Sequence, residues 1–577
     1  MIALSIVLCR YLGFSPEGVP FRVEIGFLPI ALVAYILGPL YSAAAYLIAD
    51  IIGSLLSGYA PNIAISACQM LFGFTMGIFF YRKNISLPRT ILCFASTGAV
   101  IDVLCKTPIL MFLYGWTWNS TLVDRLINLG INLPIRIILF YVLYRALRKP
   151  IAKFFKLENK NNFAMYANSF QAVTVPGLDR IASLCKKLGH PEHKLNFIHI
   201  AGTNGKGSVS AYMACILQEA GYTVGKYISP NLIKVNERIS INGTDISDTD
   251  LNSILARIEP LAKEVESELG IAPTQFEIWT AAAFVYFDHK HCDYVVLETG
   301  LGGELDATNI IKKNELAIIT RLGLDHTQYL GNTIEDIAKA KAGIIKSRSA
   351  TGTVVTVAQD EEALLVICKA CEDHGVACEI ALPESRGHEG IYEKFSVAGM
   401  DDIVCGIGGY HQVENAALAV LGAKKLGIGE NDIRSGIFKA KNPARFELIS
   451  ENPLVIYDGG HNENGIAALT NSLSRYFGEC DKVVIFTCMR DKDITHSLKM
   501  LSRGKTEFIY TAVSDNPRAS GAGELLVRAR SLGYDGIAYE NVGEAYEDAI
   551  TRGKLVLICG SLYLYKDLIE YFENKCR

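Results

Sequence analysis

Apolar segments of membrane-helix length occupy the first 150 residues, and they constrain the fold of this chain more than any other feature. They lie at about residues 27–38, 39–57, 61–81, 91–114 and 126–147, with a shorter segment at 2–13. A helix needs ~20 mainly apolar residues to cross a bilayer. The pattern therefore predicts an all-α membrane domain of about six helices over residues 1–157.

The distribution of charge orients this domain. The chain of 577 residues has a net charge of −4, but residues 1–150 are net basic and the remainder is net acidic. Basic residues gather in the loop at 82–89 and after the last apolar segment, at 145–156. Because basic loops tend to stay in the cytoplasm, we expect both clusters and all later residues on that side. The prediction is a multi-pass cell-membrane protein with a cytoplasmic remainder and no nucleic-acid partner.

Four ionisable residues fall within the predicted spans: Asp50, Asp102, Lys106 and Arg136. Charges inside a membrane are costly and often mark a substrate path, but they also form internal pairs. Asp102 and Lys106 are one helical turn apart, so a structural ion pair is an equal alternative.

The fifteen cysteines show no regular framework, which favours reduced thiols in the cytoplasm. Cys368-x-x-Cys371 has metal-like spacing, but no second pair accompanies it and its expected setting is a helix.

A glycine-rich loop at residues 202–208, Gly-Thr-Asn-Gly-Lys-Gly-Ser, follows a short apolar strand and precedes a helix-forming segment at 209–220. Glycines let the backbone wrap around an anion, and a helix N-terminus offers free N–H groups. Lys206 is placed to reach a terminal phosphate, and Ser208 to contact Mg²⁺. The strict Walker pattern is not met, because Gly207 separates Lys206 from Ser208. The loop predicts nucleotide binding, with an ordinary glycine turn as the alternative.

Beyond a polar linker near residue 157, short apolar runs alternate with helical segments, which predicts a parallel α/β sheet. Strands are expected at Phe197–Ala201, Tyr294–Glu298 and Leu316–Thr320. Ligands collect at the carboxyl ends of such strands. Glu298 ends one strand where a Mg²⁺ ligand should stand, and Asp325-His326 follow another. Each could be an ordinary core or loop residue, but three converging strand ends favour a site.

A second, smaller α/β domain of Rossmann-like character is expected after a hinge at residues 442–447. Its strands are predicted at 454–458, 483–486 and 555–559. The expected domains are therefore a membrane domain at 1–157, a central ATP-binding domain at 164–440 and a closing domain at 441–577.

Three short motifs in the membrane region are Arg22-Val-Glu-Ile-Gly-Phe-Leu-Pro29, Leu37-Gly-Pro39 and Ala49-Asp-Ile-Ile-Gly53. With them, residues 1–150 resemble the substrate-binding S-component of energy-coupling-factor vitamin transporters, and among these the folate type. The resemblance implies a vitamin-binding domain in a lipid membrane that works with separate energy-coupling transmembrane and ATPase subunits.

Further motifs follow the glycine-rich loop at residues 202–208, which we call the phosphate loop. They are Ser229-Pro-Asn-Leu232, Asn236-Glu-Arg-Ile239, Glu298 with its Gly-rich tail, Gly323-Leu-Asp-His326 and Lys341-Ala-Gly-Ile-Ile-Lys346. With them, residues 164–577 resemble the folylpolyglutamate synthase/dihydrofolate synthase family of Mur-type ligases. The resemblance implies an α/β P-loop Mur-ligase-like central domain and a smaller Rossmann-like C-terminal domain. Ala444 stands where the family usually has Gly, and Gly460 where it usually has Ala.

The resemblance also assigns roles to individual residues. The ATP-binding residues would be Asn204, Gly205, Lys206, Gly207, Ser208, Asn415, Arg445 and Asp458. Two Mg²⁺ ions would be held by Ser229, Glu298, His326 and a carbamylated Lys341. The pterin substrate would contact Thr274, Gln275, Phe276, Glu277, Leu305, Asp306 and Ala307. The catalytic residues would be Lys206, His326, Lys341 and His461. An ordinary surface-helix lysine is the alternative for Lys341, and a loop-ordering histidine for His461.

The implied reaction is ATP-dependent addition of L-glutamate to the γ-carboxyl group of a folate, joined in one chain to folate uptake. Dihydrofolate synthase activity on dihydropteroate is an alternative. The ATPase motor of a transporter is another, but no Leu-Ser-Gly-Gly-Gln signature follows the loop. A cell-wall ligase is opposed by the string Leu-Gly-Gly-x-Leu-Asp-Ala-Thr-Asn at residues 301–309.

Overall fold

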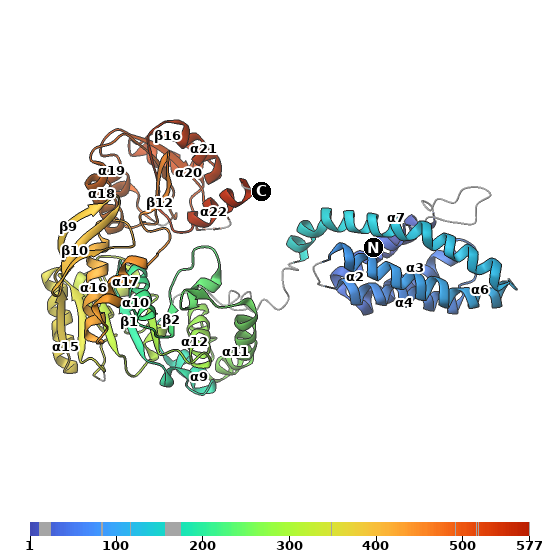
Figure 1. Ribbon diagram of the computed structural model, residues 1–577, viewed down its shortest axis with the longest axis horizontal. Coiled ribbons are helices and arrows are strands. Elements are labelled where there is room, and N and C mark those ends of the chain that lie inside the picture. Colours follow the sequence, from blue (N-terminus) through green and yellow to red (C-terminus); the bar gives the residue numbers. More distant parts are fainter. Residues whose placement is uncertain are drawn as a thin grey trace. The chain divides into compact units, whose positions relative to one another are not determined.

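The computed structural model describes residues 1–10, 25–81, 85–115, 117–155, 175–347, 349–490, 492–514, 516 and 518–575. The chain divides into two compact units, residues 1–162 and 163–577 (Figure 1). Of the predicted features, Arg22 to Glu24, Arg82 and Lys83 lie outside the described residues.

The N-terminal unit is entirely helical in its described residues. Its elements are α1 (Ile2–Arg10), α2 (Phe27–Leu37), α3 (Pro39–Leu56), α4 (Ile63–Phe80), α5 (Leu87–Ser96), the π-helix η1 (Thr97–Cys105), α6 (Lys106–Tyr114) and α7 (Trp118–Phe155). All six predicted apolar segments are helical over most of their described residues. Among the described residues, four helices are long and apolar enough to cross a membrane: Pro39–Leu56, Ile63–Phe80, Leu87–Tyr114 and Thr121–Leu147. Helix α2 is apolar but has only 11 residues, so its span and that of α1 stay predictions.

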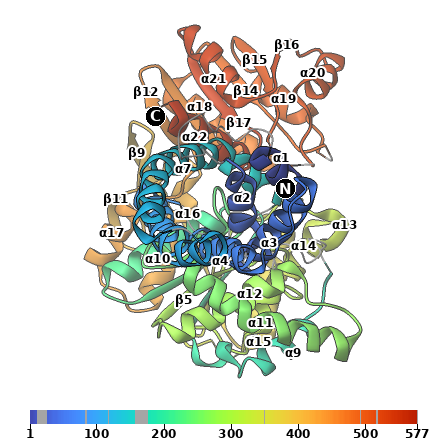
Figure 2. The same cartoon turned by 90° about the vertical axis from the view of Figure 1, so that its right-hand side faces the viewer.

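Small residues bring α3 and α4 together, as Figure 2 shows with the two helices side by side. A Cβ atom on Gly73 would lie 2.4 Å from the Ser42 carbonyl oxygen, and one on Gly77 would lie 2.2 Å from the Cα of Pro39. The Ser42 hydroxyl donates to the Gly73 carbonyl oxygen at 2.8 Å. Close backbone approach through small residues is typical of helices that pack within membranes.

Three of the ionisable residues in the apolar helices form one cluster. Asp102 accepts from the Lys106 ammonium at 2.7 Å and from the Arg136 guanidinium at 2.8 Å. The predicted Asp102–Lys106 ion pair is therefore confirmed, and Arg136 joins it from α7. The Asp50 carboxylate lies apart and accepts from the Ser66 hydroxyl at 2.7 Å.

The central domain contains an eight-stranded sheet in the order β4-β3-β2-β5-β1-β6-β7-β8. Its strands are β1 (Phe197–Ala201), β2 (Val224–Tyr227), β3 (Ile239–Ile241), β4 (Thr244–Asp245), β5 (Tyr294–Glu298), β6 (Leu316–Ile319), β7 (Thr353–Val357) and β8 (Ala377–Ala381). All neighbours from β2 to β8 in this order pair in parallel, whereas β3 and β4 are antiparallel. Strand β1 is fully buried and lies between β5 and β6, so these three strands end at one edge.

Helices and a small second sheet surround this central sheet (Figure 1). The helices are α9 (Asp179–Lys187), η2 (Pro191–Lys194), α10 (Lys206–Glu219), η3 (Val235–Arg238), α11 (Asp248–Leu269), α12 (Gln275–His289), η4 (Ala307–Ile310), α13 (Thr327–Leu330), α14 (Ile334–Ala342), α15 (Glu361–His374), α16 (Gln412–Lys425) and α17 (Glu430–Lys439). Strands β9 (Glu384–Glu389), β10 (Tyr392–Val397) and β11 (Met400–Val404) form the antiparallel second sheet. Cys368 and Cys371 lie in α15, as predicted.

The C-terminal domain is a six-stranded sheet in the order β12-β13-β17-β14-β15-β16. Its strands are β12 (Glu447–Glu451), β13 (Leu454–Asp458), β14 (Lys482–Phe486), β15 (Thr506–Thr511), β16 (Gly536–Tyr539) and β17 (Leu555–Cys559). Its helices are α18 (Glu463–Phe477), α19 (Thr495–Leu501), α20 (Ala522–Ser531), α21 (Val542–Thr551) and α22 (Leu564–Lys575). Only β12 is antiparallel to its neighbour, which fits the predicted Rossmann-like character.

Candidate active site

The glycine-rich loop follows β1 at the edge where the three central strands end. Gly202 has φ 154° and Gly205 has φ 91°, conformations that favour glycine. Side chains would also clash there, because a Cβ on Gly202 would lie 1.8 Å from the Thr320 hydroxyl oxygen, and one on Gly205 2.2 Å from Asn415 Oδ1. The Thr203 and Asn204 N–H groups both donate to the Arg321 carbonyl oxygen, which fixes the loop to the end of β6. The loop is therefore rigidly held.

Helix α10 begins at Lys206, so its N-terminus opens at the loop. No side chain caps its N-terminus at Gly205, and its first N–H groups remain available to an anion. The half-buried Lys206 donates to the Gly202 carbonyl oxygen at 3.0 Å and to the Thr203 carbonyl oxygen at 3.4 Å. Its ammonium group thus lies over the loop that a phosphate would occupy.

Ser208 is buried in the first turn of α10. Its hydroxyl oxygen is contacted by the Gln412 amide at 3.2 Å and by the Asn442 amide at 3.1 Å. Asn415, one turn along α16 from Gln412, donates to the Gln412 side-chain oxygen at 3.0 Å. The predicted nucleotide contact Asn415 is thereby placed against the loop.

Glu298 ends β5 beside the loop, and its side chain is buried. Its carboxylate receives a backbone hydrogen bond from Ser229, but Oε2 has no hydrogen-bond partner. Burial raises the pKa of Glu298 to about 7, against the opposing charges of Lys206 and Arg445. A buried carboxylate with an unpartnered oxygen is costly unless a cation or proton completes it. The sequence-based ligands Ser229 and Glu298 are therefore adjacent.

Lys341 lies on α14 and is 4 % exposed, which rules out the alternative of a surface lysine. Its ammonium group donates to the Gly202 carbonyl oxygen at 2.8 Å, so α14 reaches the phosphate loop. Burial, reinforced by the Lys206 charge, lowers the pKa of Lys341 to about 7. A large share of this amine is therefore neutral near physiological pH.

His326 follows β6 at the same edge and is exposed, with φ 51°. Its backbone N–H donates to the Asp325 carboxylate at 2.9 Å. Asn462 of the C-terminal domain donates both to Asp325 Oδ2 at 3.1 Å and to Asn204 Oδ1 at 3.2 Å. This single amide therefore joins the phosphate loop, the β6 loop and the closing domain.

Arg445 lies in the connection between the two domains, and Asp458 lies in the closing domain beside it. Asp458 ends β13 and is buried, and its two oxygens accept from the N–H groups of Phe446 at 2.9 Å and Gly460 at 2.7 Å. In this structure Asp458 therefore orders the connection. Ala444 has φ 62°, and its carbonyl oxygen accepts from the Gly459 N–H at 2.9 Å.

A cavity of about 860 Å³ lies between the two domains. Its lining includes all seven residues expected to contact a pterin, together with Ser229, His326 and His461. Leu305 is 53 % exposed and lines the cavity, where a bound apolar ring would cover it. The His461 ring contacts the Gly459 carbonyl oxygen at 3.1 Å through Nδ1, so it lines the cavity and also orders its loop.

Several cavity residues also form hydrogen bonds that stabilise the cavity wall. Thr274 and Glu277 form a capping box at the start of α12, and Arg180 donates to Glu277 Oε2 at 3.0 Å. Asp306 is buried and accepts from the Leu301 N–H at 2.8 Å and from the Thr308 hydroxyl at 2.6 Å. These side chains shape the wall, whereas Gln275, Phe276, Leu305 and Ala307 complete the lining.

Sequence reasoning gave no role to Thr320, Gln412 or Asn442, which contact the loop directly. The Thr320 hydroxyl donates to the Asn204 carbonyl oxygen at 2.7 Å. A polar residue at the end of an apolar strand was a signal that could have identified Thr320. Gln412 and Asn442 come from distant segments, and nothing in their local sequence indicates that they meet Ser208.

Two family descriptions match this part of the chain: the Mur ligase middle domain over residues 200–423 and the Mur ligase glutamate ligase domain over residues 444–562. The dihydrofolate synthase/folylpolyglutamate synthase of Bacillus subtilis is 40 % identical over 420 residues, which are 68 % of this chain and 94 % of that protein.

Solved structures agree. Folylpolyglutamate synthase from Thermotoga maritima superposes with a TM-score of 0.64 and 33 % identity, covering 71 % of this chain and 96 % of that one. Escherichia coli FolC in complex with DHPP and ADP gives 0.64 and 28 %, covering 72 % and 98 %. By this similarity, and by a glycine-rich loop that leads from β1 into α10, the chain belongs to the dihydrofolate synthase/folylpolyglutamate synthase family of ATP-dependent Mur ligases.

Proposed function

We propose that residues 163–577 join L-glutamate to the γ-carboxyl group of a reduced folate, with ATP as the energy source. The observation that carries the proposal is the cavity between the domains, which is lined by the seven pterin-matched residues and by Ser229, whose backbone donates to the Glu298 carboxylate. The E. coli relative was solved with DHPP and ADP, and the B. subtilis relative is a dihydrofolate synthase/folylpolyglutamate synthase. A pterin in this cavity and a nucleotide at the loop would bring the two reacting groups together.

The reaction has two balanced steps. A folate carboxylate oxygen attacks the γ-phosphorus of ATP, the bond to ADP breaks, and an acyl phosphate forms. The glutamate amine then attacks the acyl carbon, loses a proton, and inorganic phosphate leaves. Lys206 exchanges its two loop carbonyl acceptors for phosphate oxygens and stabilises the charge on the transferring group. Closure of the domains excludes water, which would otherwise hydrolyse the acyl phosphate.

The residues present fit a magnesium site. Glu298 offers a buried, unpartnered carboxylate oxygen next to Ser229. His326 follows β6, which β1 separates from β5 in the sheet, and it lines the same cavity as Ser229. We assign Mg²⁺ to Ser229, Glu298 and His326, where it would neutralise charge on the phosphates.

Lys341 is suited to carbamylation. Only a neutral amine can add to CO₂, and the lowered pKa of about 7 supplies it. The product replaces a buried cation with a carboxylate, which suits a second Mg²⁺ better than an ammonium group does. The Gly202 carbonyl oxygen that Lys341 now contacts keeps the modified side chain beside the phosphate loop.

The decisive measurement is ATP-dependent incorporation of labelled L-glutamate into tetrahydrofolate, with dihydropteroate as the parallel substrate. We expect incorporation into tetrahydrofolate, one phosphate released per glutamate, and loss of both when Mg²⁺ is chelated. Phosphate release that depends on neither pterin would refute the proposal. Incorporation into dihydropteroate alone would assign the dihydrofolate synthase alternative.

For the N-terminal unit we propose folate capture at the membrane, in partnership with separate energy-coupling transmembrane and ATPase subunits. Four helices of spanning length and the Asp102–Lys106–Arg136 cluster support this role, because a net positive charge in an apolar bundle suits an anionic solute. Each glutamate that the ligase adds brings one more negative charge, which hinders the vitamin from leaving. Deleting residues 1–157 should abolish folate uptake and leave ligase activity intact. Uptake that persists after this deletion would disprove the coupling.

A further inference from the structure

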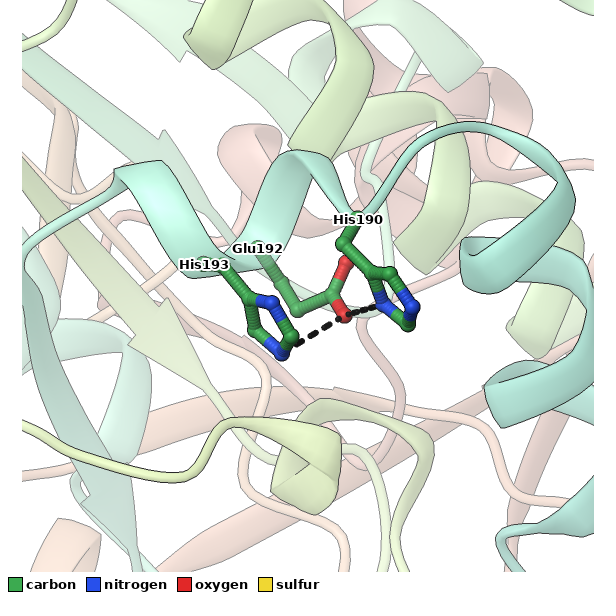
Figure 3. Close-up of side chains that lie close together, drawn as sticks. All are labelled: His190, Glu192 and His193. Carbon is green, nitrogen blue, oxygen red and sulfur yellow. Dashed lines mark hydrogen bonds and ion pairs between the residues drawn. The ribbon is translucent and has the colours of Figure 1, made fainter.

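A tight turn between α9 and β1 gathers two histidines and a glutamate away from the catalytic cavity. Its sequence is His190-Pro191-Glu192-His193, and Figure 3 shows both imidazole rings directed at the glutamate carboxylate. Within the ranges that the structure describes, this is the one group of three or more His, Cys, Asp or Glu side chains whose ligand atoms all lie within 4.8 Å of one another.

The backbone explains why these side chains converge. His190 adopts a left-handed conformation (φ 53°, ψ 57°), and its N–H donates to the Cys185 carbonyl oxygen at 2.8 Å, which ends α9. Pro191 then starts the 3-10 helix η2 with its fixed φ, and the His193 N–H donates to the His190 carbonyl oxygen at 3.1 Å. This short turn brings the His193 ring back beside the His190 ring.

The side-chain geometry resembles a set of ligands around one ion. His190 Nδ1 lies 2.8 Å and His193 Nε2 lies 3.5 Å from the same oxygen, Glu192 Oε1. The two rings stack in parallel, with centroids 4.5 Å apart and an interplanar angle of 6°. Ligand atoms at about 2.0–2.1 Å from a tetrahedral zinc ion are roughly 3.3 Å apart. Small rotations of the three side chains would therefore complete the arrangement.

A second observation points to a bound cation. The Glu192 side chain is only 1 % exposed, and its other oxygen, Oε2, is buried without a hydrogen-bond partner. The interaction with the two histidines uses Oε1 alone, and the remaining neighbour of the carboxylate is the buried Cys185 thiol, which is only a weak donor. Burying an unpaired carboxylate oxygen is costly, whereas a divalent cation would take up the charge of the whole group.

We propose that His190, Glu192 and His193 form a zinc site. Two imidazole nitrogens and one carboxylate oxygen are ligands that Zn²⁺ accepts readily, and the exposed edges of the histidines leave a fourth position for water. Mg²⁺ and Ca²⁺ prefer oxygen ligands, so a set with two imidazole nitrogens and one carboxylate favours Zn²⁺ over either ion.

The position of the site makes its role structural. Residues 190–193 precede β1 at its amino end, whereas the phosphate loop follows β1 at its carboxyl end. The next residue, Lys194, forms an ion pair with Asp288 of α12 at 2.7 Å. A bound ion would therefore brace the connection from α9 into β1 against α12, the helix whose first turn lines the substrate cavity.

The test uses the full-length chain, stripped of metal and titrated with Zn²⁺ against a chromophoric chelator. We compare it with His193→Gln, Glu192→Gln and His190→Asn, where asparagine tolerates the left-handed backbone. His374→Gln is the matched control, because His374 is another exposed histidine, at the end of α15. Substitution with Co²⁺ reports coordination by its visible absorption, and thiol ligands would add a charge-transfer band.

We expect one zinc ion per chain in the wild type and in the control, at least about tenfold weaker binding in the three variants, and no thiol charge-transfer band. Zinc should also raise the melting temperature of the wild type but not of His193→Gln. His193→Gln should keep its ligase activity, which shows that it is folded. Equal zinc binding by the wild type and His193→Gln would overturn the proposal, as would an equal loss in the control or a zinc ion that leaves only with Glu298→Gln.

Discussion

Replacing Glu298 with glutamine should stabilise the ligase unit at neutral pH while abolishing its activity. Burial raises the pKa of Glu298 from its ordinary value of 4.5 to about 7, so the folded protein prefers the neutral carboxyl. Glutamine has nearly the same shape and is neutral at every pH. The substitution therefore removes the cost of ionising a buried group and also removes a proposed magnesium ligand.

The sign and size of the effect follow from proton linkage. Below pH 4.5 the carboxyl is protonated in both the folded and unfolded states, and it costs nothing. Between pH 4.5 and 7 the unfolded chain releases its proton while the folded chain retains it, so the free energy of unfolding falls as pH rises. Above pH 7 the full loss is present, about 3 kcal/mol at 1.36 kcal/mol per pH unit. The advantage of Glu298→Gln should thus grow by about 2–3 kcal/mol between pH 5 and pH 8.

The assay is thermal unfolding of a fragment that contains residues 163–577, which form a compact unit. For a unit of about 400 residues, 3 kcal/mol corresponds to a shift of about 3–4 °C in melting temperature. The control is Glu277→Gln, which leaves the Arg180 guanidinium without its buried carboxylate and should destabilise the protein across this pH range. With saturating Mg²⁺ and ATP the wild type should become more stable than Glu298→Gln, because only the wild type gains stability from binding them.

A constant difference between wild type and Glu298→Gln from pH 5 to pH 8 would refute this reasoning. So would a wild type that is the more stable protein at pH 8 without ligands. Either result would mean that the carboxylate has a partner in solution that replaces the missing hydrogen bond at Oε2.

Three further predictions follow from the structure. In a steady-state assay with tetrahydrofolate, removing CO₂ and bicarbonate should reversibly lower the ligase rate of the wild type. The variant Lys341→Ala should be at least about 10²-fold slower, and its rate should not respond to bicarbonate. Gly205→Ala adds a Cβ 2.2 Å from Asn415 Oδ1 at φ 91°, so it should cost about 1–3 kcal/mol in chemical denaturation and raise the KM for ATP; an unchanged KM would contradict the assigned loop. Asp102→Asn leaves Lys106 and Arg136 without their carboxylate, so in detergent it should destabilise the N-terminal unit by about 3–5 kcal/mol, whereas Asp124→Asn should have little effect.

The positions of the ligase strands could be predicted from the sequence because these strands are continuous apolar runs that end in polar or glycine-rich residues. The strands at 197–201, 294–298, 454–458 and 555–559 lie where the pattern indicated. The loop that contains Lys206 was also predicted, since a glycine-rich turn from a strand into a helix is typical of a phosphate-binding loop. These features depend on neighbouring residues, which a single sequence records.

Long-range contacts were the part that the sequence could not supply. Ser208 was predicted to face a metal, but Gln412 and Asn442 reach its hydroxyl group from segments more than 200 residues away. Thr274 and Glu277 were expected only to contact the substrate, and the sequence analysis indicated neither their capping box nor the Arg180 contact with Glu277. In the N-terminal unit, composition predicted the helices but not that Arg136 would join the Asp102–Lys106 pair.

The covalent path between the two ligase domains is anchored on both sides of a single residue. Asn442 is bonded through its side chain to Ser208 in the central domain. Ala444 is bonded to Glu447 and Gly459 in the closing domain, and Asp458 ties Phe446 and Gly460 into the same body. Pro443 lies between these two anchored residues, and its fixed φ removes one of the backbone rotations available there. A rotation that moves Asn442 with the closing domain would break its hydrogen bond to Ser208, just as one that moves Asn462 would break its hydrogen bonds to Asn204 and Asp325. Domain movement is therefore coupled to the first turn of the phosphate-binding helix.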